Sequence, residues 1–168
     1  EINITWYSAL NAEGADETLD IQVERFLASR AIAMALRGVP GIYLHSLFGT
    51  RNDQEAVTRS GVNRDINRRT VDFDALLAAM EDPDTSIAQI LHGVKHLLKT
   101  RTRERAFHPR GHQRVLNLDR RCFGVARRSP EGDRLVLAVT NISSAPLSLS
   151  IPLDASEGNE PTWQNLLD

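Results

Sequence analysis

Arginine and asparagine side chains gather in one short stretch of the chain, between Ser60 and Arg69. Arg64 and Asp65 are neighbours in the middle of this stretch, and Gly61 stands near its start. A guanidinium offers five N–H donors in a planar fork, which suits paired hydroxyls, carboxylates or phosphate. The same charges could instead pair with neighbours and hold a long loop, because loop charges are commonly solvated or structural. Spacing alone favours this structural alternative over a binding site.

The element expected to carry this stretch is a strand. Residues 42–47 are apolar on both faces, as in a strand that is covered on both sides. A helix capped by Asp16 or Thr18 is predicted before it, ending near Gly38, where Pro40 blocks continuation. An apolar strand that opens into a donor-rich loop is typical of the C-terminal face of an α/β barrel.

Other elements are predicted from caps and periodicity. Three further helices are expected, over residues 52–59, 73–80 and 86 to about 107. Asn52 or Asp53 could cap the first of them and Asp72 the second. After Gly111 the pattern changes to period two, with strands expected over 113–119, 121–127, 134–141 and 147–153, and a last one near Trp163. The Ser-Pro-Glu-Gly-Asp run at 129–133 predicts a hairpin turn.

The composition is that of an ordinary globular protein, with 41% hydrophobic and 25% charged residues and a net charge of −2. No apolar run approaches the roughly 20 residues that span a bilayer, so no membrane partner is expected. Cys122 is the single cysteine, which excludes an intrachain disulfide and indicates a reducing, cytoplasmic location. The chain opens on Glu1 without an initiator Met, which suggests that it begins inside a longer parent.

A basic stretch and a pair of histidines are candidates for sites of other kinds. A basic stretch runs from Lys99 to Arg128 without any nucleic-acid-binding motif, so we expect cations at a helix end and outward-facing strand arginines. No nucleic acid partner is expected. His92 and His96 are four residues apart on a predicted helix, but no HExxH glutamate accompanies them, and no metal or cofactor is expected.

Three motifs in the first half of the chain occur in a fixed order. They are Gly-Val-Pro-Gly-Ile-Tyr at 38–43, Phe-Gly-Thr-Arg-Asn-Asp at 48–53 and Asn-Arg-Asp-Ile-Asn-Arg at 63–68. Together they resemble the sucrose phosphorylases and their relatives, in the α-amylase superfamily (glycoside hydrolase family 13). Residues 3–10 also resemble the segment that follows the acceptor loop in that family.

The resemblance implies an α/β fold, with the chain as the C-terminal fragment of a (β/α)8 TIM barrel. Residues 1–108 would hold the last helices and strand 8 of the barrel, and residues 109–168 a small antiparallel β domain. The parent would be a retaining glycosyltransferase that moves glucose from sucrose, or from a glucosylglycerate- or glucosylglycerol-type donor, to inorganic phosphate. Its partners would be the sugar, phosphate and the remainder of the parent barrel, with a homodimer left open.

The resemblance carries three substrate-binding residues over to this chain. Arg64 matches the family arginine that hydrogen-bonds hydroxyls of the glucosyl unit, and Asp65 would orient it. Glu1 falls where sucrose phosphorylases carry a Gln on the mobile acceptor loop, and a carboxylate there would repel phosphate, which puts sucrose itself in doubt. The catalytic nucleophile and acid/base would precede Glu1, so the chain carries no catalytic residue and is expected to be inactive alone.

Two other functions stay open. The chain could be a non-catalytic module that binds carbohydrate or a partner, or it could belong to an α-glucoside hydrolase of the same superfamily. Phosphate-dependent release of glucose 1-phosphate by the intact parent would separate a phosphorylase from a hydrolase.

Overall fold

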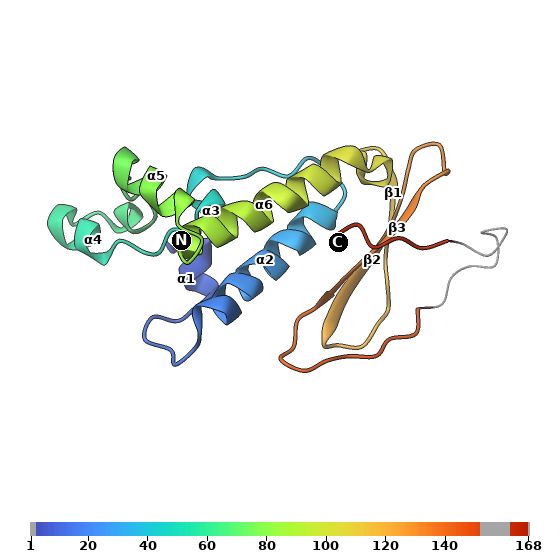
Figure 1. The fold of residues 1–168 in the computed structure, drawn as a ribbon, viewed down its shortest axis with the longest axis horizontal. Helices are drawn as coiled ribbons and strands as arrows, with labels where there is room; N and C mark the ends of the chain where they lie inside the picture. The colour runs from blue at the N-terminus through green and yellow to red at the C-terminus, as the bar shows by residue number, and fades with distance from the viewer. Residues whose placement is uncertain (1–2, 152–161, 168) are drawn as a thin grey trace. The chain divides into compact units, whose positions relative to one another are not determined.

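The computed structural model describes residues 3–151 and 162–167, and its helices precede its strands along the chain (Figure 1). The elements are α1 Trp6–Leu10, α2 Leu19–Ala35, α3 Leu44–Leu47, α4 Gln54–Ser60, the 3-10 helix η1 Asn63–Asn67, α5 Phe73–Glu81, α6 Ser86–Arg103, the 3-10 helix η2 Arg105–Phe107, β1 His112–Val115, β2 Cys122–Arg128 and β3 Leu135–Asn141. In this described part, no helix is both long enough and apolar enough to cross a membrane.

The chain divides into two compact units. The first comprises residues 1–30 and 40–95, and the second comprises residues 31–39 and 96–168. The C-terminal ends of α2 and α6 therefore belong to the same unit as η2 and the three strands. The assignment of residues 1–108 to a barrel and 109–168 to a β domain stays a prediction.

Helices α4 and α5 begin at the capping residues that the sequence marks. Asp53 Oδ1 accepts a hydrogen bond from the Ala56 N–H at 2.9 Å. Asp72 Oδ1 accepts one from the Ala75 N–H at 2.8 Å. Each bond satisfies an N–H group that has no partner inside its own helix. The two short helices predicted in this region are confirmed.

The core of the first unit is built from side chains of α1, α2 and α6. Tyr7, Phe26 and Ile90 are almost completely buried, and the ring centroids of Tyr7 and Phe26 lie 5.6 Å apart. Gly49 passes directly over this core with a φ of +58°. A Cβ at Gly49 would lie 2.2 Å from Ile90 Cδ1 and 3.0 Å from Tyr7 Cδ2, so the close approach requires glycine.

The expected strand at 42–47 is wrong. Residues 44–47 form the single-turn helix α3, and residues 39–43 belong to no strand. A strand needs a hydrogen-bonded neighbour, and among the described residues every strand pairing involves only β1, β2 and β3. Without a neighbouring strand, the 42–47 run closes a local turn, in which the Ser46 N–H donates to the Tyr43 carbonyl at 2.8 Å.

The second unit contains a three-stranded antiparallel sheet in the order β1-β2-β3. Val115 pairs with Val125, and Val125 pairs in turn with Ala138. The predicted hairpin turn joins β2 to β3, with the Ser129 N–H bonded to the Arg134 carbonyl at 3.0 Å. Gly132 takes a φ of +81° in this turn. The second and third predicted strands and the turn between them are confirmed. The first is confirmed only in part, because β1 ends at Val115 and residues 116–119 carry no strand.

The fourth and last predicted strands are not formed in the described residues. Residues 147–151 and 162–167 carry no strand, and residues 152–153 lie outside the described part of the chain. The alternation of leucine and serine at 147–150 is compatible with a strand. A strand also needs a free edge of a sheet to pair with, and a defined register on it. Local pattern cannot supply either.

Two buried arginines of the second unit bind the C-terminal end of α2. Arg127 is fully buried and Arg101 is 8% exposed. Arg101 donates to the carbonyls of Met34, Leu36 (3.2 Å) and Gly38 (2.5 Å). Met34 lies in the last turn of α2, and Leu36 and Gly38 follow it. Carbonyls at a helix end have no intrahelical N–H partner, so the guanidinium replaces the missing donors.

Arg127 completes the same arrangement from strand β2. It donates to the carbonyls of Ala35 (2.8 Å), His108 (3.0 Å) and His112 (3.3 Å). Both guanidiniums also lie 5.8 Å from the centroid of the Phe107 ring. Burial lowers the pKa of Arg127, as does the nearby charge of Arg101. The expectation that the strand arginines face outward is therefore wrong for Arg127, because its partners are carbonyls distant in sequence.

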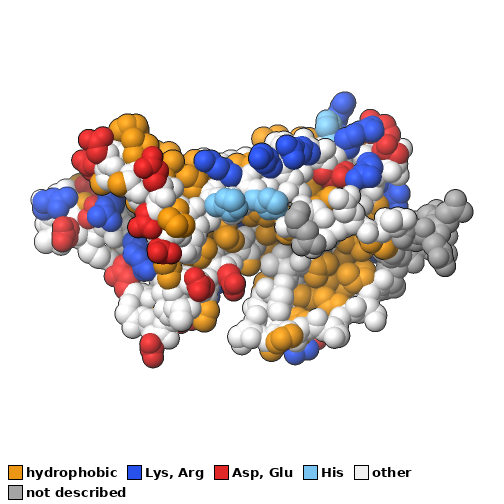
Figure 2. All heavy atoms as spheres, viewed as in Figure 1, with side chains coloured by type: hydrophobic (Ala, Val, Ile, Leu, Met, Phe, Trp, Pro, Cys, Tyr) orange, Lys and Arg blue, Asp and Glu red, His pale blue; other side chains and the backbone are white. Residues whose placement is uncertain are grey.

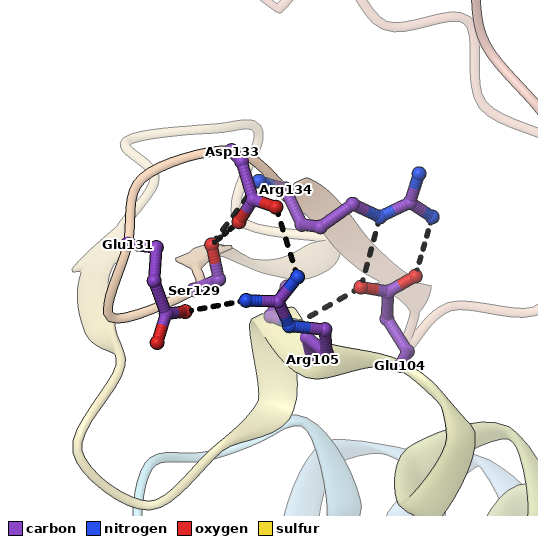
Figure 3. A network of polar contacts seen from close by, with 7 residues as sticks. Glu104, Arg105, Ser129, Glu131, Asp133 and Arg134 are labelled. Carbon is purple, nitrogen blue, oxygen red and sulfur yellow. Dashed lines mark hydrogen bonds and ion pairs between the residues drawn. The ribbon is translucent and has the colours of Figure 1, made fainter.

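The hairpin turn is joined to η2 by a network of charged side chains (Figure 3). Glu104 is 8% exposed, and its carboxylate accepts hydrogen bonds from Arg134 Nη2 at 2.6 Å and from the Ala106 N–H at 3.0 Å. Arg105 reaches Glu131 at 2.9 Å and Asp133 at 3.0 Å on the exposed side of the turn. Exposed ion pairs contribute little, so the Glu104 contacts dominate this network.

The Glu104 carboxylate should make the stability of the second unit depend on pH. The Arg134 guanidinium and the Ala106 N–H hold the pKa of Glu104 below its ordinary value of 4.5. A lowered carboxyl pKa contributes stability above the unfolded pKa, and this contribution is lost as the pH falls through the folded pKa. At pH 7, Glu104→Gln should lower the free energy of unfolding by about 2 kcal/mol.

Urea unfolding of wild type and Glu104→Gln at several pH values between 3 and 7 measures this contribution. We expect the difference between the two proteins to be constant above about pH 5 and to shrink below pH 4.5. Exposed Glu131→Gln is the matched control and should show a small difference at every pH. A difference for Glu104→Gln that stays constant down to pH 3 would contradict the assignment.

Candidate functional site

The structure places two of the three predicted site residues on η1. Arg64 is exposed and Asp65 is half-buried. The Asp65 N–H donates to the Val62 carbonyl at 3.0 Å, and the Asp65 carbonyl accepts from the Arg68 N–H at 3.2 Å. Glu1 lies outside the described residues. The positions of Arg64 and Asp65 on one turn of a surface helix agree with either a binding or a structural role.

The loop that carries η1 is closed by backbone hydrogen bonds. Gly61 caps the C-terminal end of α4, with a φ of +70° and its N–H donated to the Val57 carbonyl at 2.8 Å. The chain then turns into η1 and returns to the start of α4, where the Asp53 N–H donates to the Ile66 carbonyl at 2.9 Å. Asp53 therefore has two roles: its side chain caps the N-terminus of α4, and its backbone N–H binds η1. The loop is a closed unit and not an extended connection.

Residues of the first motif contact the other end of η1. The Tyr43 hydroxyl donates to the Asn67 carbonyl at 3.3 Å, and the Tyr43 ring meets the His45 ring edge-on with centroids 5.2 Å apart. His45 Nδ1 lies 3.2 Å from Thr50 Oγ1. Burial lowers the pKa of His45, which favours the neutral ring at neutral pH.

The second motif is anchored to the helices beneath it. Arg51 donates to Gln22 Oε1 at 2.7 Å and lies 4.9 Å from the centroid of the Tyr7 ring. The next residue, Asn52, accepts from the Thr5 N–H at 2.8 Å through its side chain. Burial raises the pKa of Tyr7, although the Arg51 and Arg25 charges act in the opposite direction. The motif at 48–53 is therefore fixed by contacts from two segments, residues 5–7 and α2.

A pocket of about 400 Å³ lies beside this anchored segment in the first unit. Its lining combines two guanidinium side chains, one carboxylate, three hydroxyls and apolar groups: Phe48, Gly49, Thr50, Arg51, Arg69, Thr70, Val71, Asp72, Ala75, Leu76, Ser86 and Ile87. Arg64 and Asp65 are not among these residues. The structure thus brings Arg69 of the donor-rich stretch to the pocket and leaves Arg64 on η1.

A second pocket, of about 700 Å³, lies in the second unit. It is lined by β3, residues 162–167 and parts of α2 and α6, including Phe107, Arg101 and Trp163. Figure 2 shows hydrophobic side chains open to view over this unit. Within the described ranges, no group of three or more His, Cys, Asp and Glu side chains could hold a metal ion.

Sequence reasoning missed Tyr43 and Arg51 as residues that support the site. Both stand inside motifs that carry the family resemblance, at 38–43 and 48–53, so a signal for them was present. Their contacts were not foreseeable, because the partner of each lies more than twenty residues away, at Asn67 for Tyr43 and Gln22 for Arg51.

No family model matches the chain. It is 38% identical over 85% of its length to a glucosylglycerate phosphorylase from Spirochaeta thermophila. It is 35% identical over 89% of its length to a glucosylglycerate phosphorylase from Allomeiothermus silvanus. A sucrose phosphorylase from Agrobacterium vitis is 34% identical over 49% of the chain. The homologues of this chain are therefore glucosylglycerate and sucrose phosphorylases.

The chain matches only a part of each of these proteins. It covers 24%, 26% and 15% of the three relatives, so it spans about a quarter or less of their length. Among solved structures, a sucrose 6F-phosphate phosphorylase from Thermoanaerobacter thermosaccharolyticum superposes on 84% of the chain with a TM-score of 0.67 and 22% identity. At that identity the superposition shows the fold alone: helices followed by a small antiparallel sheet, as in part of that phosphorylase. The resemblance read from the three motifs is confirmed.

Proposed function

We propose that this chain is the C-terminal part of a retaining α-glucoside phosphorylase whose donor is of the glucosylglycerate type. The observation that supports this is the extent of the alignments. Similarity to glucosylglycerate phosphorylases continues over 85% and 89% of the chain, whereas similarity to the sucrose phosphorylase from Agrobacterium vitis covers 49%. The longer match favours the glucosylglycerate enzymes over the sucrose enzymes.

In this proposal the chain binds the sugar and does not break its bond. A carboxylate elsewhere in the protein attacks the anomeric carbon, and an acid protonates the leaving oxygen. Phosphate then takes the glucosyl unit from the covalent intermediate with retention of configuration. Arg64 would bridge two neighbouring hydroxyls of that unit with its planar fork, and Asp65 would orient the arginine. Glu1 would stand on the acceptor loop, and the chain alone would be inactive.

The protein that carries this chain should release glucose 1-phosphate from glucosylglycerate when inorganic phosphate is present. Arg64→Ala should lower kcat/KM about 100-fold, or about 2.7 kcal/mol of transition-state stabilisation, because the fork contacts the glucosyl unit as it is transferred. Arg59→Ala is a matched control, since Arg59 is also exposed and lies in the same loop on α4. It should retain wild-type turnover.

The same assay separates the alternatives. Release of free glucose without dependence on phosphate would indicate a hydrolase, and no turnover of any α-glucoside would indicate a non-catalytic module. Faster phosphorolysis of sucrose than of glucosylglycerate would contradict the proposed donor. Wild-type turnover in Arg64→Ala would remove Arg64 from the sugar site while leaving the phosphorylase assignment intact.

A further inference from the structure

The Tyr43 hydroxyl contacts η1 from outside, as the Asp53 N–H also does. Its hydrogen bond to the Asn67 carbonyl (3.3 Å) fixes the C-terminal end of η1. The other contact is the bond from the Asp53 N–H to the Ile66 carbonyl (2.9 Å). Tyr43 and Asp53 come from different segments, so the two bonds hold consecutive carbonyls of η1 from separate supports.

The hydrogen bond from Tyr43 to Asn67 also affects Arg64, because of where the two residues lie on η1. A 3-10 helix has three residues per turn, so residues 64 and 67 lie one above the other on the same side of η1. A bond that fixes the Asn67 carbonyl therefore fixes the turn from which the Arg64 side chain projects. We propose that Tyr43 is a positioning residue for Arg64, and this inference rests on the proposed function.

Burial argues against a purely structural role for the Tyr43 hydroxyl. Tyr43 is 56% exposed, and its bond to Asn67 lies at the surface. Surface substitutions that remove one such contact usually change the free energy of unfolding only slightly. A well-placed guanidinium, in contrast, loses much of its effect on a transition state when it is displaced by about 1 Å. The hydroxyl therefore affects the geometry of η1 more than the stability of the fold.

Tyr43 is itself held in place by a chain of contacts. Its ring meets His45, and His45 Nδ1 lies 3.2 Å from Thr50 Oγ1, at the start of the anchored segment. The Thr50 N–H also donates to the His45 carbonyl at 3.0 Å. The support for Arg64 thus runs from the fixed residues of the second motif through His45 and Tyr43 to η1.

A double-mutant cycle in the protein that carries this chain tests the inference. Tyr43→Phe removes the hydroxyl and keeps the ring, and should lower kcat/KM for glucosylglycerate phosphorolysis about fivefold without lowering the melting temperature. In an Arg64→Ala background the same change should have no further effect, because a positioning residue acts through the arginine. Thr58→Val is the control, because its exposed hydroxyl donates to the Gln54 carbonyl (2.9 Å) within α4.

Hydrogen exchange gives a second readout that does not need turnover. Tyr43→Phe should speed exchange of the Asp65 and Arg68 amides severalfold in this chain, and Thr58→Val should not. A full additional fivefold loss in the Arg64→Ala background would place the hydroxyl on the substrate itself and overturn the inference. Unchanged kinetics together with unchanged exchange would also overturn it. A wild-type protein without phosphorolysis would refute the proposed function, whereas an active protein with an unaffected Tyr43→Phe variant refutes only this inference.

Discussion

Arg127→Met should lower the free energy of unfolding of the second unit by about 4 kcal/mol, because three carbonyls lose a charged donor in a buried site. Arg127 is fully buried and bonds the carbonyls of Ala35, His108 and His112. Methionine is an unbranched apolar side chain without a hydrogen-bond donor, so the three carbonyls would lose the donor that Arg127 provides. Relief of the repulsion between Arg127 and Arg101 should offset a small part of the cost.

Urea unfolding followed by tryptophan fluorescence can isolate this effect. The chain has two tryptophans, so Trp6→Phe leaves Trp163 as the reporter of the second unit. Arg120→Met is the control, since Arg120 is exposed. It should change the free energy of unfolding by less than about 0.5 kcal/mol. A cost below about 1 kcal/mol for Arg127→Met would show that water replaces the guanidinium in satisfying these carbonyls.

Gly49→Ala should destabilise the first unit by about 3 kcal/mol, through backbone strain and overpacking together. The φ of +58° is unfavourable for any residue with a Cβ. The added methyl would also lie 2.2 Å from Ile90 Cδ1, and both Ile90 and the neighbouring Tyr7 are almost fully buried. Neither side chain can move without disturbing the core.

Gly14→Ala separates the two causes. Gly14 has a similar φ of +75°, and a Cβ there would meet nothing within 4 Å. It should therefore cost only the backbone strain, about 1 kcal/mol. Unfolding monitored by Trp6 in a Trp163→Phe background measures both variants. Equal losses for Gly49→Ala and Gly14→Ala would mean that the core yields to the added methyl.

The sequence was most informative where structure depends on neighbours along the chain. Asp53 and Asp72 cap α4 and α5 as predicted, because a cap needs only a carboxylate three residues before the N–H it binds. The hairpin at 129–133 was also predictable, since Pro130 and Gly132 restrict or permit the φ values that the turn needs. Arg64 and Asp65 were singled out on donor chemistry and resemblance, and their role stays a prediction.

Features that depend on distant partners could not be read in advance. The run at 42–47 has the composition of a buried strand, yet strand formation requires a neighbour that local pattern cannot specify. Arg127 sits in an alternating strand pattern that suggests exposure, but its acceptor at Ala35 is 92 residues away. The support that Tyr43 gives to η1 is hidden for the same reason, because its acceptor follows 24 residues later.

The attachment of the α2 end to Arg101 and Arg127 limits how the sheet could be exchanged between proteins. Recombination that joined residues 96–168 to a foreign sequence would leave residues 31–39 behind, and Arg101 and Arg127 would lose their acceptors in that segment, including the Met34 and Ala35 carbonyls. A transplantable cassette must therefore include both segments, although they are not contiguous in the gene. Domain shuffling acts on contiguous stretches, so this sheet is expected to be inherited together with the helices that precede it.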